Sequence, residues 1–304
     1  MSTQRRFSIV IATRNRPESL ATCLESLARL DYPADDFEVI VVDDGGTSPV
    51  DGVAARFTDR LPLAVLRLPH RGPGAARNAG AQRSTGRWLA FTDDDCQVTQ
   101  DYLRRLERRF ARHPDALVGG RTVNGHAESL CSTATQRLID YLYDYSRRTG
   151  RLEFFTSNNL ALPTDRFRAL GGFDASWRFA AGEDRDLCDR WRHAGGVLVH
   201  APEAVIVHRH LLDMRRFWRQ HFNYGRGAHH FHRARARDER GRHEVEPWRF
   251  YTGLLAYPFK HEPAGRALRV AALLGLSQVA NTLGFLSERR RDMTTQETTG
   301  PPPG

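Results

Sequence analysis

The sequence predicts an α/β protein: a Rossmann-like, mostly parallel central β-sheet flanked by helices, followed by a basic helical C-terminal appendage. Short β-branched runs alternate with helical patterns through the first hundred residues, which is typical of a parallel sheet with crossover helices. Acidic clusters follow two of these runs, where open parallel sheets bind their ligands. The 304 residues are enough for one large domain or two small ones.

The elements follow in a regular order. Phe7–Ile11 is an apolar, β-branched strand pattern, and Pro17 then begins a helix because its fixed φ suits the first helical turn. Further strands are expected at 37–42, 63–68, 88–92, 116–123, 160–162, 197–199 and 204–208. Further helices are expected at 75–83, 101–112, 133–148, 165–170 and 184–194, and the chain is helical and basic from 211 to about 240.

We divide the chain into a main domain at 1–225, a basic helical extension at 226–293 and a disordered tail at 294–304. The tail is polar and contains three consecutive prolines. The polar N-terminus carries no secretory signal. The four cysteines are far apart, which favours buried thiols in a reducing compartment. We therefore expect a cytoplasmic protein.

The basic residues are unevenly distributed. The net charge is +9, but residues 1–203 carry 28 basic and 27 acidic side chains, and residues 204–304 carry 17 and 9. A protein that binds nucleic acid through its folded domain would spread the basic charge over that domain. We therefore expect no nucleic-acid partner, and we place the basic surplus in the C-terminal third.

Carboxylates gather where two predicted strands end, at Asp43-Asp44 and at Asp93-Asp94-Asp95. Three adjacent carboxylates repel one another unless a cation neutralises them, and oxygen ligands suit Mg²⁺ or Mn²⁺. The alternative for each cluster is a solvated acidic turn. Glu183-Asp184 begins a predicted helix, where acidic residues either complement the helix dipole or hold a general base.

The turn Gly72-Pro73-Gly74 precedes a helix that contains Arg77. A helix N-terminus and an arginine can both contact phosphate. The spacing matches neither the P-loop nor the dinucleotide-binding fingerprint, because the required lysine or glycines are absent. ATPase and dehydrogenase functions are therefore disfavoured.

Several motifs stand in a characteristic order, I-V-I-A-T-R-N-R-P, V-V-D-D-G-G, G-P-G-A-A-R-N-A-G, F-T-D-D-D-C, S-N-N-L-A, G-G-F-D and G-E-D-R-D-L. Over about residues 7–225 this series resembles the family 2 glycosyltransferases, inverting nucleotide-sugar enzymes of the GT-A fold. A single motif could match by chance, but the whole ordered series is specific.

The resemblance implies roles for individual residues. It implies that the nucleotide sugar is bound by Ala12, Thr13, Arg14, Asp44, Arg77, Asp93 and Asp94. It implies a divalent cation, Mn²⁺ or Mg²⁺, on Asp95 and Asp93, although three consecutive aspartates leave the register open by one. Asp184, paired with Glu183, matches the catalytic base, and Asn158 and Asn159 line the sugar or acceptor region.

Two further residues are candidates with open alternatives. His208 ends a predicted strand together with His210, and it either reaches the metal or belongs to a surface histidine pair. Trp177 lies just before the predicted base and either stacks on a sugar, forms part of a lid or packs in the core.

We therefore expect a metal-dependent, inverting transferase of the hexosyltransferase type. Its donor is a nucleotide-diphosphate sugar, with UDP or dTDP as the expected nucleotide, and its acceptor is a hydroxyl of a glycan, a lipid-linked molecule or a small molecule. One alternative is a basic nucleotide- or membrane-binding module without catalysis. Another is a nucleotidyltransferase of related fold, although its glycine-rich activation loop with a lysine is absent.

The segment Val270–Leu286 contains no charged residue, and arginines flank it on both sides. It is shorter than the roughly 20 apolar residues that span a bilayer. It lies in the interface of an anionic membrane, with its arginines reaching lipid phosphates, or packs against its own domain or a partner chain. A true span is the third and least favoured alternative. A peripheral location on the inner face of the membrane is thus one expectation.

Overall fold

The computed structural model describes residues 5–48, 50–150, 152–177, 181–240 and 246–298. The chain forms two compact units, unit 1 (residues 1–125 and 152–210) and unit 2 (residues 126–151 and 211–304). Unit 1 contains the β-sheet, and unit 2 is helical. The expected division at residue 225 stays a prediction. Of the expected tail, residues 299–304 lie outside the described residues.

Unit 1 is built on one sheet of eight strands within the described residues, in the order β3-β2-β1-β4-β7-β6-β8-β5. The strands β1 to β4 are mutually parallel, whereas β7 pairs antiparallel with both β4 and β6, so the sheet is mixed. The expected α/β fold is confirmed. The strands are β1 (Phe7–Thr13), β2 (Phe37–Asp44), β3 (Leu63–Leu68), β4 (Trp88–Asp93), β5 (Cys96–Val98), β6 (Leu117–Asn124), β7 (Leu160–Pro163) and β8 (Leu198–His208).

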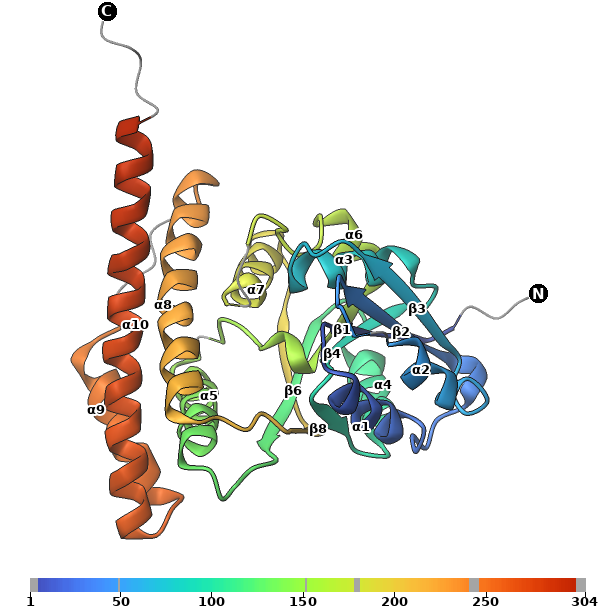
Figure 1. Cartoon of the computed structure of the whole chain (residues 1–304), viewed down its shortest axis with the longest axis horizontal. Helices are drawn as coiled ribbons and strands as arrows, with labels where there is room; N and C mark the ends of the chain where they lie inside the picture. Colours follow the sequence, from blue (N-terminus) through green and yellow to red (C-terminus); the bar gives the residue numbers. More distant parts are fainter. Residues whose placement is uncertain (1–4, 49, 151, 178–180, 241–245, 299–304) are drawn as a thin grey trace, which may run out of the picture. The chain divides into compact units, whose positions relative to one another are not determined.

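Helices cover both faces of this sheet (Figure 1). Successive side chains of a strand point to opposite faces, so Ile9 and Ile11 of β1 join α1 and α4 in one core. Val10 faces the other side, where it meets Gly80 of α3. The helices of unit 1 are α1 (Pro17–Leu27), α2 (Asp51–Ala54), α3 (Pro73–Arg83), α4 (Tyr102–Arg112), α6 (Thr164–Ala169) and α7 (Glu183–His193), with short 3₁₀ turns η1 (Ala34–Asp36), η2 (Ala55–Phe57) and η3 (Ser157–Asn159).

One part of the strand prediction is wrong. The two strands expected at 197–199 and 204–208 are a single strand, β8. Strand β8 continues through Pro202, and its pairing with β6 shifts register between Gly120 and Arg121. The short strand β5 was not predicted, because three residues show no periodicity.

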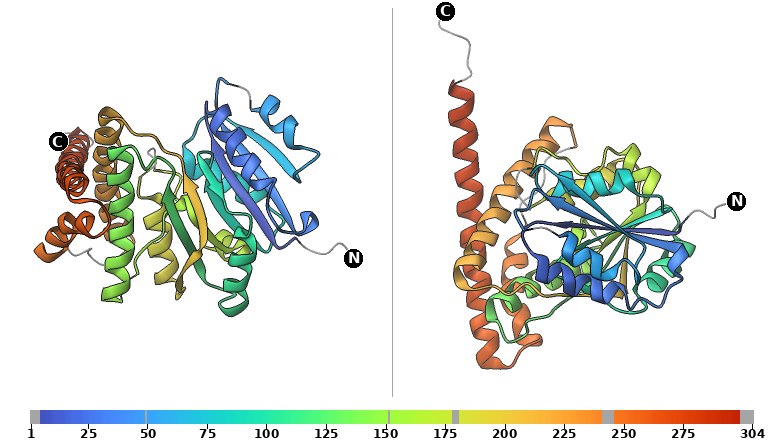
Figure 2. Two further views of the ribbon diagram at one scale, coloured as in Figure 1. Left: turned by 90° about the horizontal axis from the view of Figure 1, so that it is seen from below. Right: turned by 45° about the vertical axis from the view of Figure 1, so that its right-hand side comes forward.

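Unit 2 consists of α5 (Leu130–Thr149), α8 (Met214–Arg237), α9 (Trp248–Ala256), the 3₁₀ turn η4 (Tyr257–Lys260) and α10 (Ala264–Thr298). Helices α8 and α10 lie side by side and run in the same direction (Figure 2). Glycine allows the close approach, because a Cβ on Gly225 would overlap the carbonyl oxygen of Asn281. Further along, Arg226 pairs with Glu288 at 2.6 Å.

Candidate active site

The site is built where β1, β2 and β4 end. These strands are neighbours and parallel, and their registers pair Thr13 with Asp43 and Ala12 with Asp93. The carboxyl ends of the three strands therefore lie next to one another, at one edge of the sheet. The structure thus brings the acidic clusters of β2 and β4 to the same edge, as the sequence predicted.

Asp44 is a buried carboxylate at the end of β2. It accepts hydrogen bonds from the backbone N–H groups of Arg71 at 2.8 Å and Gly72 at 3.0 Å. It also contacts Nδ1 of His70 at 2.8 Å. These bonds fix the loop before α3, where Gly72 has a φ of +94° that favours glycine.

Asp94 and Asp95 form the turn between β4 and β5. Asp94 is buried and accepts a hydrogen bond from Oγ1 of Thr13 at 2.7 Å. The Arg16 guanidinium pairs with Asp94 at 2.8 Å and with Asp95 at 2.5 Å. Burial raises the pKa of Asp94 to about 7, although Arg16 and Thr13 act in the opposite direction.

Asp95 immediately precedes β5 and faces His208, which ends the neighbouring strand β8. Its Oδ1 lies 3.2 Å from Nε2 of His208, and the possible ligand atoms of Asp95, Cys96 and His208 all lie within 4.8 Å of one another. Burial alone would raise the pKa of Asp95, but the bond and charge of His208 and the charge of Arg16 hold it well below the usual range. Burial raises the pKa of Cys96, which keeps that thiol neutral.

Arg77 connects the two acidic motifs. This residue of α3 is 4% exposed, and its guanidinium donates to Oδ1 of Asp93 at 2.8 Å and to Oε1 of Glu183 at 3.1 Å. Asp93 ends β4 and Glu183 begins α7, so one buried cation ties the turn of three aspartates to the Glu-Asp helix. Among the described residues, Nε of Arg77 and Oε2 of Glu183 are buried without a hydrogen-bond partner.

Asp184 is half-buried beside Glu183 in the first turn of α7. Its carboxylate accepts from the backbone N–H of Arg185 at 2.8 Å and from that of Ser157 at 3.2 Å. Burial raises the pKa of Asp184 above its ordinary value, while these N–H groups and the Arg77 charge act against the shift. Burial and the neighbouring Asp184 charge raise the pKa of Glu183 as well. A carboxylate whose pKa is raised is a better proton acceptor.

The remaining predicted residues have varied surroundings. The Asn159 side chain is used inside the fold, because it accepts from the Tyr102 hydroxyl at 2.9 Å and donates to the carbonyl of Ala204. Asn158 is buried and accepts from Thr156 at 2.8 Å. Arg14 is exposed, with Nη1 3.2 Å from Nε2 of His70, and Ala12 is half-buried.

Trp177 is buried, with 6% of its surface exposed. The residues that follow it, 178–180, lie outside the described residues. The expected roles of Asn158, Asn159 and Trp177 toward a sugar or an acceptor stay predictions.

Sequence reasoning missed Arg16 and His70. Arg16 immediately precedes α1, within the T-R-N-R-P motif, and contacts two of the three clustered aspartates. Its position directly before Pro17 at a strand end was the available signal. For His70 the sequence offered no such signal, because this residue lies in a loop that belongs to no motif or periodic segment.

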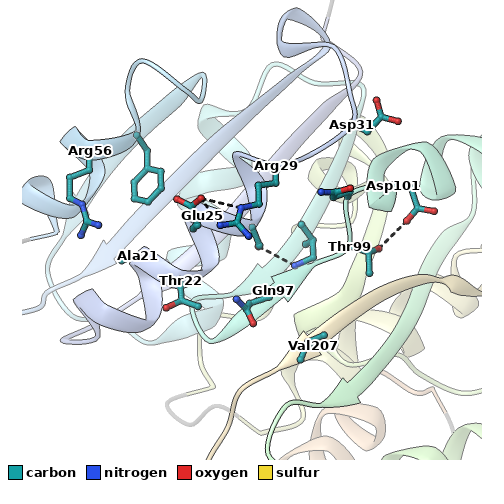
Figure 3. A pocket seen from close by; sticks show the side chains of 14 residues that line it. Ala21, Thr22, Glu25, Arg29, Asp31, Arg56, Gln97, Thr99, Asp101 and Val207 are labelled. Atoms are coloured by element: carbon teal, nitrogen blue, oxygen red, sulfur yellow. Dashed lines mark hydrogen bonds and ion pairs between the residues drawn. The ribbon is translucent and has the colours of Figure 1, made fainter.

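A cavity of about 930 Å³ lies beside the site, between α1, β5 and the loop after β5 (Figure 3). Its lining includes the polar residues Glu25, Gln97 and Asp101. A smaller cavity of about 190 Å³ shares Gln97 with it and is lined by Asp95. The larger cavity contains none of the predicted site residues in its lining, so the candidate site is defined by the strand ends.

Comparison with known proteins gives a consistent picture. Residues 8–170 match the family model "Glycosyl transferase family 2". The chain is 31% identical over 233 residues to the pre-mycofactocin glycosyltransferase of Mycobacterium tuberculosis, covering 74% of this chain and 47% of that protein. It is 30% identical over 219 residues to the validoxylamine A glucosyltransferase of Streptomyces hygroscopicus subsp. jinggangensis, covering 62% and 52%. The chain thus spans about half the length of these curated relatives.

Solved structures share the fold at low sequence identity. The mannosyltransferase PcManGT of Pyrobaculum calidifontis, in complex with GDP-Man and Mn²⁺, matches with a TM-score of 0.61 at 19% identity, over 97% of this chain and 81% of that one. Residues 1–349 of TarS of Staphylococcus aureus, in complex with UDP-GlcNAc, match with a TM-score of 0.57 at 15% identity, over 95% and 92%. These likenesses confirm the fold class.

Proposed function

The chain belongs to glycosyltransferase family 2, and we propose that it transfers a sugar from a nucleotide-diphosphate donor to a hydroxyl acceptor, with inversion at the anomeric carbon. The observation that carries this proposal is the Arg77 bridge, which joins Asp93 at the end of β4 to Glu183 at the start of α7. Arg77 thereby links the strand ends that we propose to bind the donor to the helix that carries Asp184, the half-buried carboxylate next to Glu183.

Asp184 is the proposed general base. As the acceptor oxygen attacks the anomeric carbon, its proton passes to the Asp184 carboxylate, and the bond between that carbon and the diphosphate oxygen breaks. The electron pair of the broken bond leaves with the nucleoside diphosphate. A single displacement inverts the anomeric carbon and needs no carboxylate nucleophile, unlike a retaining hydrolase with its second catalytic carboxylate.

The donor set at the turn between β4 and β5 fits a divalent cation of the Mn²⁺ or Mg²⁺ type. Carboxylate oxygen and imidazole nitrogen are both acceptable to Mn²⁺, and Asp95 and His208 would supply them. Asp93 is a further proposed ligand, although its Oδ1 is engaged by Arg77. When bound, such a cation neutralises the charge that develops on the leaving diphosphate.

The nucleotide is proposed to lie along the ends of β1 and β2. Thr13, Arg14 and Asp44 surround that edge, and Arg77 adds a buried positive charge below it. The likeness to structures that hold UDP-GlcNAc and GDP-Man supports a sugar nucleotide as the ligand. UDP and dTDP sugars, and transfer of a hexose, remain our proposal for the donor.

A donor screen tests this function. The protein is incubated with UDP-, dTDP- and GDP-hexoses, with Mn²⁺, Mg²⁺ or EDTA, and both the melting temperature and nucleotide release are measured. A matched donor should raise the melting temperature by mass action, and only with metal. Asp95→Asn should lose the metal effect, and Asp59→Asn, which changes an exposed carboxylate, should keep it. The proposal fails if no donor is turned over and metal never alters nucleotide affinity. Pyrophosphate release from a nucleoside triphosphate and a sugar 1-phosphate would indicate a nucleotidyltransferase instead.

A further inference from the structure

Exposed apolar side chains are concentrated in unit 2. Among the described residues, every exposed large hydrophobic side chain except Val197 belongs to this unit. Trp248 is the most exposed of them, at 69%, followed by Leu268 at 64%. Scattered apolar residues are normal on a protein surface, but a contiguous patch marks a binding surface.

The patch begins as a stripe on α10. Leu268, Val279 and Leu286 are exposed and are separated by eleven and seven residues, which are three and two helical turns. The exposed residues Ala272 and Leu283 fall on the same side of the helix. These five residues carry no charge, and the stripe that they form from Leu268 to Leu286 is about 27 Å long at 1.5 Å per residue. The opposite side of α10 is buried within unit 2, for example at Val270, Leu274 and Ser277.

Helix α9 extends this stripe sideways. Trp248, Tyr251 and Leu255 lie on one side of α9, at helical spacing, and all three are exposed. Leu255 lies beside Gly275 of α10, where its Cδ2 is 3.9 Å from the position that a Cβ would take. The exposed sides of α9 and α10 are therefore adjacent, and we call them together the α9–α10 surface.

The charged residues that are exposed around this surface are basic, whereas the acidic residues of the same segment are not exposed. Between residues 246 and 293, all of which the structure describes, six basic side chains are exposed: Arg249, Lys260, Arg269, Arg289, Arg290 and Arg291. The four carboxylates of the same segment are buried or half-buried. Three of them form ion pairs with basic side chains inside unit 2, as Glu262 does with Arg137 at 2.7 Å and Asp292 with His229 at 2.6 Å.

We propose that the α9–α10 surface binds an anionic phospholipid bilayer, with both helices lying in the plane of the membrane interface. Exposed tryptophan, tyrosine and leucine suit the boundary between headgroups and acyl chains, and the surrounding arginines match lipid phosphates. A second copy of the chain fits less well, because a two-fold interface on this surface would bring the same cations face to face.

A transmembrane orientation of α10 is also disfavoured. By length and composition, Ala264–Met293 is long and apolar enough to cross a membrane, because it contains an 18-residue window with a mean hydropathy of 1.4. However, its buried side pairs Glu288 and Asp292 with charged residues of α8. Those ion pairs hold α10 along α8, which suits a helix that lies on the surface of the membrane.

Vesicle flotation of the full chain tests this proposal. The vesicles contain phosphatidylcholine alone or phosphatidylcholine with 30% phosphatidylglycerol, at about 0.1 M salt. We expect binding to the anionic vesicles only, with a loss of at least tenfold in affinity when the salt is raised to about 1 M, because screening shortens the range of the arginine charges.

Two variants and a control locate the contact. Leu268→Gln/Val279→Gln/Leu286→Gln removes the apolar stripe, and Arg269→Gln/Arg289→Gln removes one cation near each end. Each should weaken vesicle binding about tenfold or more. Arg108→Gln/Arg112→Gln removes two exposed arginines from α4 of unit 1 and should bind as the wild type does. Helical circular dichroism and melting temperature verify that all three variants fold.

Three results would overturn the proposal. One is recovery of the wild type in the lipid-free fraction with both kinds of vesicle. Another is a dimer in lipid-free buffer that the stripe variant converts to a monomer, which would assign the surface to a second copy. The third is membrane association that resists salt and alkaline washing, which would indicate a span. None of these three results bears on the proposed function, which is measured by nucleotide release with a soluble acceptor. The two proposals can therefore fail separately.

Discussion

Arg77 is the residue on which the geometry of the site depends. Its guanidinium is buried and shared between Asp93 and Glu183, which come from different motifs. A buried arginine is tolerated only when its charge is compensated, and the two carboxylates provide that compensation. In turn, the arginine allows Glu183 to be buried beside Asp184 without an uncompensated negative charge.

Replacing Arg77 should therefore destabilise the protein. Arg77→Met keeps much of the side-chain volume but leaves Glu183 buried without its cation. The expected loss is about 3–5 kcal/mol in the free energy of unfolding, measured by urea denaturation. Arg108→Met, an exposed change on α4, should alter stability by less than about 0.5 kcal/mol. Equal stability of the two variants would show that the bridge contributes nothing.

At the scale of residues, the sequence predicted which side chains lie at the site better than it predicted their hydrogen-bond and ion-pair partners. The acidic residues of β4 and α7 were expected at the site from their positions at strand and helix ends, and Asp93 and Glu183 do meet there through Arg77. The partners depend on side-chain directions that no periodicity records. Arg16 therefore emerged only in three dimensions, as did the internal use of Asn159.

At the scale of elements, unit 2 depends on how closely its helices approach. Gly225 and Gly284 both lie where α8 and α10 meet, and a Cβ on either would overlap the main chain of the other helix. The same unit buries His221 of α8, whose Nε2 lies 3.1 Å from Oγ1 of Thr135 in α5. Helical periodicity predicts such helices, but it does not indicate which of them pair.

An alanine at Gly284 should separate α8 from α10. Gly284→Ala forces the two backbones apart and is expected to cost about 1–3 kcal/mol in the free energy of unfolding. Gly265→Ala, on the same helix with no atom within 4 Å, should be neutral or slightly stabilising. Thermal denaturation of both variants measures the difference. A Gly284→Ala protein as stable as Gly265→Ala would contradict the close packing.

His221 should make stability depend on pH. Burial lowers its pKa from 6.5 to about 4, so the unfolded chain takes up a proton first as the pH falls. The contribution of His221 to stability is thus complete above pH 6.5 and is lost progressively between pH 6.5 and pH 4. From pH 7.5 to pH 5 the loss amounts to about 2 kcal/mol.

His221→Phe isolates this contribution, because phenylalanine keeps a ring at the site and does not titrate. The difference in unfolding free energy between pH 7.5 and pH 5 should be smaller in the variant by that amount. His113→Gln, at an exposed histidine of unit 1, should retain the wild-type pH dependence. An identical pH dependence in His221→Phe and the wild type would show that His221 is not held neutral in the fold.

At the scale of the whole molecule, the charge surplus and the acidic site lie in different parts of the chain. The ordered motifs indicated the family, and the match over residues 8–170 confirms it. The order of the strands was beyond sequence reasoning, because β7 and β8 join the sheet through long-range pairing. In the proposed function, the donor and the acceptor would be selected by side-chain contacts, and periodicity does not record the geometry of such contacts.

The role of Asp184 is tested most directly by Asp184→Asn. Asparagine preserves the size of the side chain and can still accept from Ser157, but it cannot take a proton. With the donor identified by the screen, the turnover number should fall by about 10²–10⁴-fold, while the donor dissociation constant and the melting temperature stay close to those of the wild type. Asp165→Asn, at an exposed aspartate of α6, should turn over normally. A folded Asp184→Asn protein with wild-type turnover would contradict the assignment of Asp184 as the base.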